Sequence, residues 1–393
     1  MSAPVLVVGG GIGGLTAALC LAKEGIQVVL LEQADDFHQV GAGIQLSPNC
    51  SRVLHHLGLE DALRVRGFLP EGTQFRDYRS GRVISESVLG RSAMERYGAP
   101  YYHIHRGDLL TTLVEAVENS ADIERHLGQR IVDLNLRPDR VDIISTSGAK
   151  FTGRALIGAD GIHSSVRSSL WGETAPDFTG NVAWRALVPV ARLPEGMVRP
   201  MSTAWWGPHK HFVHYYVRGG ELVNCVCVVE KEGWSVESWT ERGQYAELKS
   251  DFQGWHEEIQ TLIDAADRDS LFKWALFDRP PMSRWSQGRA TLLGDACHPT
   301  LPFMAQGAAM AIEDSAVLAA CLKVESEVPE SLARYESLRL KRTAGVQMGS
   351  RRNAKVFHLT GVKAWARNRA ARRAGGHTMD RLFRYDALTS VDA

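Results

Sequence analysis

The chain has 393 residues, of which 44% are hydrophobic and 23% are charged, values ordinary for a folded protein of about two to three domains. Its 45 basic residues equal its 45 acidic ones, and this balance argues against a nucleic-acid partner, which usually binds a basic domain. No apolar run reaches the roughly 18 residues of a membrane span, and the N-terminus lacks the basic segment of a signal peptide. Six cysteines are too few for a disulfide scaffold, so we expect free thiols and a cytoplasmic location.

The first predicted element is a strand over residues 5–8, and a glycine-rich loop follows it. Gly9, Gly11 and Gly14 have the spacing G-x-G-x-x-G and open an apolar helical pattern that ends at Gly25. A second strand over residues 27–31 leads into Glu32. In such a unit the glycines permit a tight turn, close approach to a pyrophosphate and close helix packing, while the acid accepts hydrogen bonds from ribose hydroxyls. The segment predicts a dinucleotide-binding fold.

Two later strands each end at an acid beside a glycine. Residues 156–161 end in Asp160 and Gly161, and residues 290–296 contain Gly294 and Asp295. Carboxylates at such strand ends suit the hydroxyl-rich ribityl chain of a flavin, and a helix beginning near Gly307 can direct N–H groups at the flavin ring. No second G-x-G-x-x-G follows a strand, so we expect no separate nicotinamide-binding domain.

Together the three segments resemble the fingerprints of group A single-component flavoprotein aromatic hydroxylases, over residues 1 to about 350. Residues 41–45 with Pro48-Asn49, and residues 105–109, look like the branch that contains salicylate hydroxylase, 3-hydroxybenzoate 6-hydroxylase and 6-hydroxynicotinate 3-monooxygenase. The resemblance implies an α/β fold like that of p-hydroxybenzoate hydroxylase, in which a Rossmann-like FAD-binding domain interleaves with an antiparallel β-sheet substrate domain. The expected FAD-binding domain is residues 1–70, 100–178 and 288–350, the substrate domain residues 71–99 and 181–285, and a C-terminal helical tail residues 351–393.

The resemblance also implies a reaction. NADH or NADPH would act as a transient co-substrate that reduces FAD, and a flavin hydroperoxide formed with O2 would hydroxylate a small phenolic aromatic acid such as salicylate or 3-hydroxybenzoate. The alternatives are a 6-hydroxynicotinate-type hydroxylase of an N-heteroaromatic ring, or an FAD reductase that acts on another apolar substrate without oxygen transfer. We expect a monomer or homodimer with no metal, since His298 beside Cys297 has no further ligand near it in sequence.

Cofactor contacts are assigned to the glycine loop, to the acids at the strand ends and to one arginine. These residues are Gly9, Gly11, Ile12, Gly13, Gly14, Glu32, Gln33, Gly43, Arg106, Asp160, Gly294, Asp295 and Gly307. A surface salt bridge for the arginine and turn caps for the two Asp residues are the structural alternatives. The expected substrate pocket contains Gln45, Pro299, Pro302 and Phe303. By resemblance Gln45 agrees with the hydroxybenzoate enzymes, whereas Trp205-Trp206 looks more like the hydroxynicotinate enzyme.

Residues 204–229 alternate like an antiparallel hairpin that turns at residues 218–221. On its first strand His211 and Tyr215 share one face, while His214 lies on the other. The resemblance aligns His211 and Tyr215 with pocket residues, and a neutral imidazole can draw the proton from a phenol and so activate the ring. We therefore predict His211 and Tyr215 as the catalytic pair. They can instead be half-buried sheet residues, and His214 replaces His211 if the register slips by one.

Overall fold

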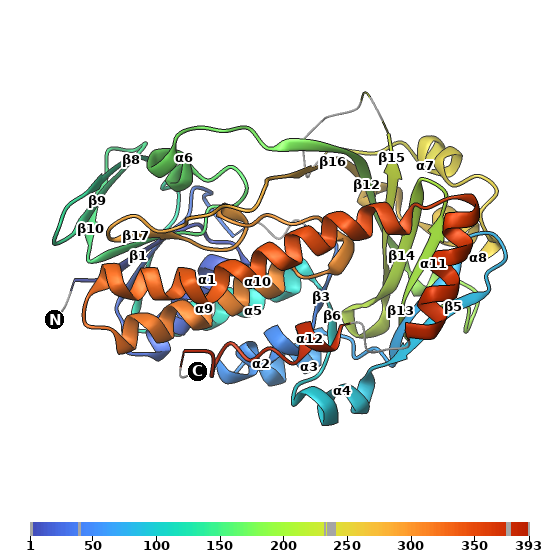
Figure 1. The fold of residues 1–393 in the computed structure, drawn as a ribbon, viewed down its shortest axis with the longest axis horizontal. Helices are drawn as coiled ribbons and strands as arrows, with labels where there is room; N and C mark the ends of the chain where they lie inside the picture. The colour runs from blue at the N-terminus through green and yellow to red at the C-terminus, as the bar shows by residue number, and fades with distance from the viewer. Residues whose placement is uncertain (1–2, 38–40, 232, 234–240, 375–378, 392–393) are drawn as a thin grey trace.

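The structure is a computed structural model that describes residues 3–37, 41–231, 233, 241–374 and 379–391. Figure 1 shows two parts side by side, one built of helices around a parallel sheet and one built around a large antiparallel sheet, with a long helix running along both. No helix within the described ranges is long and apolar enough to cross a membrane. The combination confirms the predicted α/β class with an antiparallel second sheet.

A five-stranded parallel sheet lies at the centre of the first part, in the order β17, β11, β1, β2, β7. Its strands are β1 (Val5–Val8), β2 (Val28–Leu31), β7 (Ile123–His126), β11 (Ala155–Gly158) and β17 (Ala290–Leu292). Strands buried on both faces favour uninterrupted aliphatic runs, and β1, β2 and β11 are such runs. The two strands predicted at the start of the chain are β1 and β2.

Helices and a small second sheet surround the parallel sheet. Helix α1 (Ile12–Lys23) packs against α5 (Arg106–Glu118) and α9 (Gly307–Val324), and the helix expected to begin near Gly307 is therefore confirmed. The small sheet consists of β8 (Ile131–Leu136), β9 (Val141–Ser145) and β10 (Lys150–Gly153). The remaining elements of this part are β3 (Gly43–Leu46), β6 (Tyr102–His105), α2 (Pro48–His56), α3 (Glu60–Arg66), α4 (Gly90–Tyr97) and α6 (Ser165–Trp171).

The second part is a seven-stranded sheet in the order β16, β12, β15, β14, β13, β4, β5. Its strands are β4 (Gly72–Asp77), β5 (Val83–Val88), β12 (Asp177–Pro189), β13 (Met201–Gly207), β14 (Lys210–Val217), β15 (Leu222–Glu230) and β16 (Phe272–Asp278). All neighbours are antiparallel except β13 and β4, which run parallel. Residues 72–88 and 177–278, which are separated in sequence by elements of the first part, thus join one sheet.

The single hairpin predicted over residues 204–229 is wrong in one respect. The turn at residues 218–221 is present, but a further turn at Pro208 and His209 divides the first half into β13 and β14. Pro208 has no N–H for a ladder hydrogen bond, and His209 has a left-handed backbone with φ 59°. These two residues end one strand and begin the next.

The two faces of the large sheet have different neighbours. On one face, Phe212 packs against Phe252, which follows α7 (Tyr245–Asp251). Phe212 belongs to the same buried cluster as residues of α8 (Glu257–Ala265). Cys225 and Cys227 lie buried in this cluster as free thiols, because residues two apart on one strand face the same side. The opposite face of β14, which carries His211 and Tyr215, meets the loop and helices of the first part.

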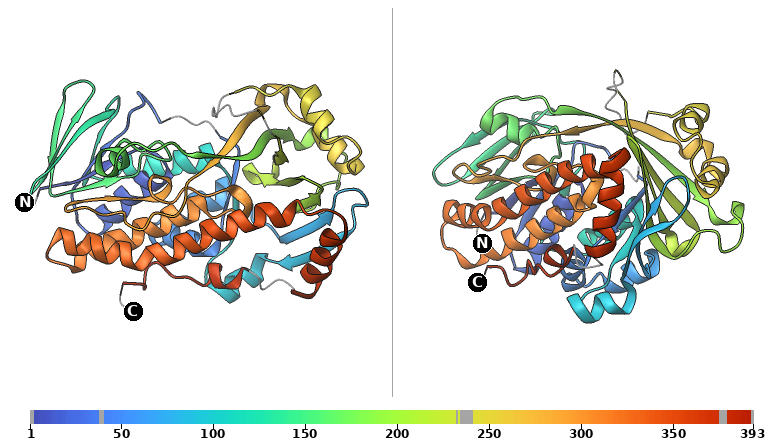
Figure 2. Two further views of the ribbon diagram at one scale, coloured as in Figure 1. Left: turned by 45° about the horizontal axis from the view of Figure 1, so that its top comes forward. Right: turned by 45° about the vertical axis from the view of Figure 1, so that its right-hand side comes forward.

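Helix α10 (Val328–Phe357) joins the two parts along their length (Figure 2). It continues without a break through residue 350 to Phe357, whose ring packs on Trp206 of the large sheet, so α10 crosses the boundary predicted at residue 351. Helix α11 (Gly361–Ala374) then lies against β5, and α12 (Asp380–Phe383) returns to α2.

Candidate active site

The turn from β1 into α1 shows why three glycines stand there. Gly9 has φ 112°, and a Cβ on it would lie 2.5 Å from the Ala159 carbonyl oxygen. A Cβ on Gly14 would lie 1.8 Å from the Gly9 carbonyl oxygen, whereas a Cβ on Gly11 would meet no atom within 4 Å. Gly9 and Gly14 are thus required by the fold, and the open space beside Gly11 at the start of α1 fits a pyrophosphate.

We expect the two positions to respond differently to the same change. Gly14→Ala should prevent folding, because its overlap with backbone costs more than about 4 kcal/mol. Gly11→Ala should fold normally but bind FAD at least about tenfold more weakly, about 1.4 kcal/mol, because the methyl group occupies the phosphate space. Circular dichroism and FAD titration distinguish these outcomes. Equal FAD affinity in wild-type protein and Gly11→Ala would contradict the placement of the pyrophosphate.

Glu32 follows β2, and its carboxylate is held beside the glycine turn. Its Oε2 accepts a hydrogen bond from the Gly10 N–H at 2.5 Å, and its Oε1 accepts one from the Ala34 N–H at 2.9 Å. The neighbouring Gln33 is exposed. Ile12 and Gly13 begin α1, where Gly13 packs against Leu293 of the later Gly-Asp segment. The predicted nucleotide residues of the first motif therefore lie together.

Asp160 of the Asp-Gly segment caps a helix, which is the structural alternative given above for this residue. The Asp160 carboxylate accepts hydrogen bonds from the backbone N–H groups of Ser165 at 2.7 Å and Val166 at 3.1 Å. These contacts cap the N-terminus of α6. The buried Arg167 donates to the carbonyl oxygens of Ile162 at 2.7 Å and Ala296 at 2.8 Å, which ties this segment to the Gly-Asp segment.

Asp295 and Arg106 are electrostatic neighbours, with Asp295 exposed after β17 and Arg106 half-buried at the start of α5. Asp295 reaches open space, yet desolvation by the surrounding protein raises the pKa of its carboxyl, with Arg106 acting in the opposite direction. Desolvation likewise lowers the pKa of Arg106, and Asp295 opposes that shift. Gly294 beside them has φ 64°, which allows the sharp turn after β17. An accessible carboxylate with a guanidinium near it fits the polar groups of a flavin cofactor.

We expect Asp295→Asn to bind FAD about 10- to 100-fold more weakly, because it removes a charged acceptor worth about 1.5–3 kcal/mol. The comparison change Asp160→Ala should instead lower stability by about 1 kcal/mol, as the loss of a helix cap does, with little change in FAD affinity. Fluorescence titration with FAD and urea denaturation measure the two quantities. The reverse pattern would show that Asp160 and not Asp295 holds the cofactor.

The loop from Pro299 to Gly307 lies under helix α10, which fixes its backbone. Gln347 donates to the Pro299 carbonyl oxygen at 2.9 Å, and Ser350 donates to that of Leu301 at 2.5 Å. Within the loop Pro302 is exposed, whereas Phe303 is buried with its ring centroid 5.1 Å from that of His211. Of the predicted pocket residues in this loop, Pro302 is thus the accessible one, and the Phe303 ring packs on the histidine.

Gln45 connects the first part to the large sheet. Its Oε1 accepts a hydrogen bond from the Tyr101 hydroxyl at 2.6 Å, and its Nε2 donates to Ser202 Oγ at 2.9 Å. Gly43, predicted to contact the cofactor, must lack a side chain because a Cβ there would lie 2.7 Å from the Tyr215 ring. The structure therefore places Gln45, Gly43 and Tyr215 at one junction.

His211 and Tyr215 lie on the predicted face of β14. Desolvation, with His358 adding to it, lowers the pKa of His211 well below its usual range, so the imidazole is neutral at pH 7. Desolvation also raises the pKa of Tyr215, with Arg185 opposing. The alternative residue His214 faces the other way, with its Nε2 3.4 Å from Glu258 of α8. The register therefore agrees with the predicted one.

Two residues that lie at this site were not predicted from the sequence. Arg185 of β12 is an electrostatic neighbour of Tyr215 and Arg106, and its guanidinium lies 4.7 Å from the Trp274 ring centroid. A lone arginine inside an apolar strand is a signal that could have found it. His358 lies 147 residues from His211 and contacts it directly, which nothing in the sequence indicates.

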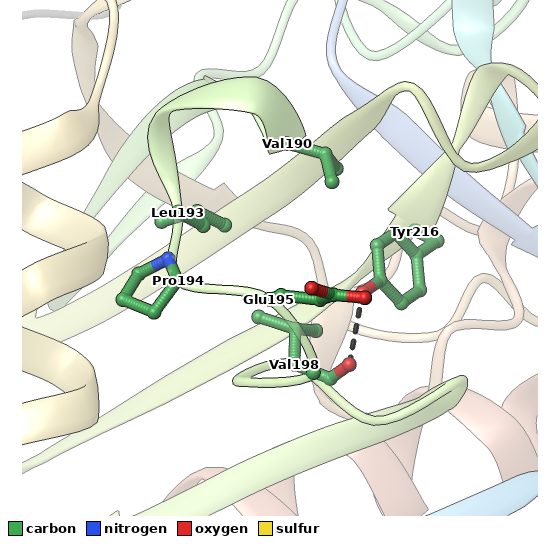
Figure 3. A pocket seen from close by; sticks show the side chains of 7 residues that line it. Val190, Leu193, Pro194, Glu195, Val198 and Tyr216 are labelled. Atoms are coloured by element: carbon green, nitrogen blue, oxygen red, sulfur yellow. Dashed lines mark hydrogen bonds between the residues drawn. The ribbon is translucent and has the colours of Figure 1, made fainter.

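A hollow of about 260 Å³ lies on the other face of the large sheet (Figure 3). It is lined by Val190, Leu193, Pro194, Glu195, Gly196, Val198 and Tyr216. The Tyr216 hydroxyl donates to the Val198 carbonyl oxygen at 2.8 Å. Since Tyr216 points away from the face that carries Tyr215, this hollow is separate from the candidate active site.

One nucleotide-binding turn, acids at the ends of two further parallel strands, and a large antiparallel sheet beside them define an FAD-dependent oxidoreductase. A family model described as "FAD binding domain" matches residues 2–350, and the chain belongs to this family.

Two curated relatives and a solved structure support the assignment. The chain is 40% identical over 356 residues, covering 90% of it and 88% of the relative, to the 3-amino-4-hydroxybenzoate 2-monooxygenase PtnB3 of Streptomyces platensis. It is 38% identical over 389 residues, covering 98% and 94%, to the 3-hydroxybenzoate 6-hydroxylase of Polaromonas naphthalenivorans. Klebsiella pneumoniae HpxO complexed with FAD and uric acid matches with TM-score 0.87 and 28% identity over 99% of this chain and 97% of that one. The predicted FAD-dependent monooxygenase is confirmed.

Proposed function

We propose that this monooxygenase hydroxylates a small phenolic aromatic acid of the salicylate or 3-hydroxybenzoate kind, with NADH or NADPH as reductant. The observation that carries the proposal is the position of His211, a buried neutral imidazole on the sheet face that meets the loop of Phe303. Among the described residues its Nε2 has no hydrogen-bond partner. An unpartnered imidazole nitrogen can take the proton of a phenol.

The chain's own residues would bind and activate the substrate, while bound FAD supplies the electron transfer and the activation of oxygen. His211 would draw the phenol proton away and so increase electron density in the ring. Tyr215 would position the ring beside it. Arg185 and Arg106 are electrostatic neighbours, and together they favour a carboxylate in the adjoining space. Exclusion of water by the surrounding apolar residues would protect the reaction from side products.

Position 45 favours a substituted benzoate, because by resemblance its glutamine agrees with the hydroxybenzoate enzymes. Tyr101 and Ser202 fix the orientation of the Gln45 amide. One N–H and one oxygen lone pair of the amide remain for a polar group of the substrate. An oxygen-independent FAD reductase is the remaining alternative, and it would show no consumption of O2 with any phenol.

A substrate panel tests the proposal. The purified holoenzyme is given salicylate, 3-hydroxybenzoate, 4-hydroxybenzoate and 6-hydroxynicotinate, and NADH loss, O2 uptake and product mass are followed together. We expect a hydroxybenzoate to stimulate NADH oxidation most, with either simple addition of one oxygen or addition with loss of CO2. Faster turnover of 6-hydroxynicotinate than of every benzoate would contradict the proposed substrate class.

A further inference from the structure

A row of hydrogen-bonded titratable side chains lies behind His211. His211 Nδ1 is 2.9 Å from His358 Nε2, and His358 Nδ1 is 2.9 Å from Glu230 Oε1. The other carboxylate oxygen of Glu230 is 2.7 Å from His209 Nδ1. Each contact is within ordinary hydrogen-bond distance, so the four side chains form one continuous path.

The path leads from the interior to the surface. His211 is 3% exposed and His358 is 4% exposed. The side chains of Glu230 and His209 are 42% and 66% exposed. The inner end of the path is the imidazole assigned to the substrate, and the outer end is in contact with water.

The ionised carboxylate of Glu230 determines which ring nitrogens of His358 and His211 carry protons. Desolvation acts to raise the pKa of Glu230, but hydrogen bonds from His209 and His358 lower it overall, so this group is ionised at pH 7. The pKa of His358 is lowered by desolvation, with opposing effects from Glu230 and further lowering by His209 and Arg367. A neutral His358 beside a carboxylate donates from Nδ1, which leaves its Nε2 to accept from the Nδ1–H of His211. The lone pair of His211 is then on Nε2.

Three separate elements are needed to bring these groups together. His358 ends α10, Glu230 ends β15, and His209 occupies the turn before β14. The His209 N–H contacts the His358 carbonyl oxygen at 3.3 Å, and the Glu230 N–H donates to the His209 carbonyl oxygen at 2.9 Å. A histidine in a left-handed turn costs about 1 kcal/mol or more, a cost that a glycine would avoid.

We propose that His358 and Glu230 are positioning residues that set the tautomer of His211 and relay the substrate's proton to solvent. The inference rests on the proposed function. The phenol O–H bond breaks as N–H forms at His211 Nε2, and the proton on Nδ1 moves to His358 Nε2. The proton on His358 Nδ1 passes to the Glu230 carboxylate, from which water removes it. No electrons are transferred, and the reverse passage of one proton restores the starting tautomers.

Proton release after substrate binding tests the relay without turnover. Holoenzyme is mixed with the preferred phenol and a pH indicator in weak buffer, with no NADH present, and the release of protons is followed by stopped flow. In His358→Gln the amide oxygen can still accept from His211 but cannot pass a proton onward, so we expect release to slow at least about tenfold. Glu230→Gln should slow it similarly. Added imidazole should restore fast release in His358→Ala, where there is room for it, and not in His358→Gln.

Glu124→Gln is the matched control, because it removes a carboxylate from an exposed pair with His126 at 2.8 Å, and it should leave release unchanged. Wild-type rates in both His358→Gln and Glu230→Gln would overturn the relay. Nitrogen-15 NMR of the histidine rings provides a test that needs no substrate: we expect His211 to carry its proton on Nδ1, and a proton on Nε2 would overturn the assigned tautomers. If no phenol is a substrate, the proposed function fails, while this spectrum still decides the relay's starting state.

Discussion

The change His211→Ala is expected to reduce hydroxylated product by about 100- to 10,000-fold, the usual contribution of positioned acid–base help. Reduction of the flavin by NADH should continue, because His211 lies on β14 of the large sheet and not among the nucleotide-binding residues of β1 and α1. The electrons that no longer reach the substrate should appear as hydrogen peroxide. Comparing NADH consumed, product formed and peroxide released measures this loss of coupling.

His214 supplies a matched control for this experiment. It is a buried histidine on the same strand, but it faces Glu258 on the opposite side of the sheet. His214→Asn should retain the wild-type ratio of product to NADH in the protein that folds. If the two variants lose coupling to the same extent, the loss is a general effect of disturbing β14, and the role of His211 as the proton acceptor is wrong.

Arg339→Met should lower the free energy of unfolding by about 3–5 kcal/mol, because it leaves buried carboxylates without their partner. Arg339 has no exposed side-chain surface, and its guanidinium is 2.6 Å from Glu313 and 2.7 Å from Asp314. This cluster joins α10 to α9 above the parallel sheet. Urea denaturation of the holoenzyme at saturating FAD measures the change.

An exposed ion pair provides the comparison for Arg339. Arg137 lies 2.9 Å from Asp142 with 47% of its side chain exposed, and Arg137→Met should cost at most about 1 kcal/mol. Although desolvation opposes it, Arg339 lowers the pKa of Glu313, and His298 with Arg339 lowers that of Asp314. The stabilisation is therefore present at neutral pH and is lost as pH falls through the folded-state pKa values. Equal effects of the two substitutions would contradict a stabilising role for the buried cluster.

Local patterns predicted the first nucleotide-binding unit because each step depends on neighbours in sequence. The glycine turn, the helix after it and the acid after β2 are all set by residues within one short segment. The same is true of the face that His211 and Tyr215 share, since side chains alternate along any strand. These features could be predicted because each depends on residues that are close together in the sequence.

What the sequence did not predict depends on contacts between distant segments. Gly43 is a glycine because Tyr215 packs on it, and His211 is oriented by His358 from the end of α10. Asp160 was predicted as a cofactor residue with a turn cap as the alternative, and its carboxylate is hydrogen-bonded to the start of α6. The turn before β14 did have a local signal in Pro208, but the left-handed backbone of the non-glycine residue His209 had none. Such features follow from tertiary packing and not from spacing.

Incorporation of labelled oxygen tests directly whether this protein hydroxylates an aromatic ring with O2. The holoenzyme is incubated with NADH, the preferred hydroxybenzoate and 18O2, and the product is analysed by mass spectrometry. We expect one 18O atom per product molecule, and a matching loss of NADH in the wild-type protein. Product that carries oxygen from water, or steady NADH oxidation with no oxygen added to any phenolic acid, would contradict the assignment of this chain as an aromatic hydroxylase.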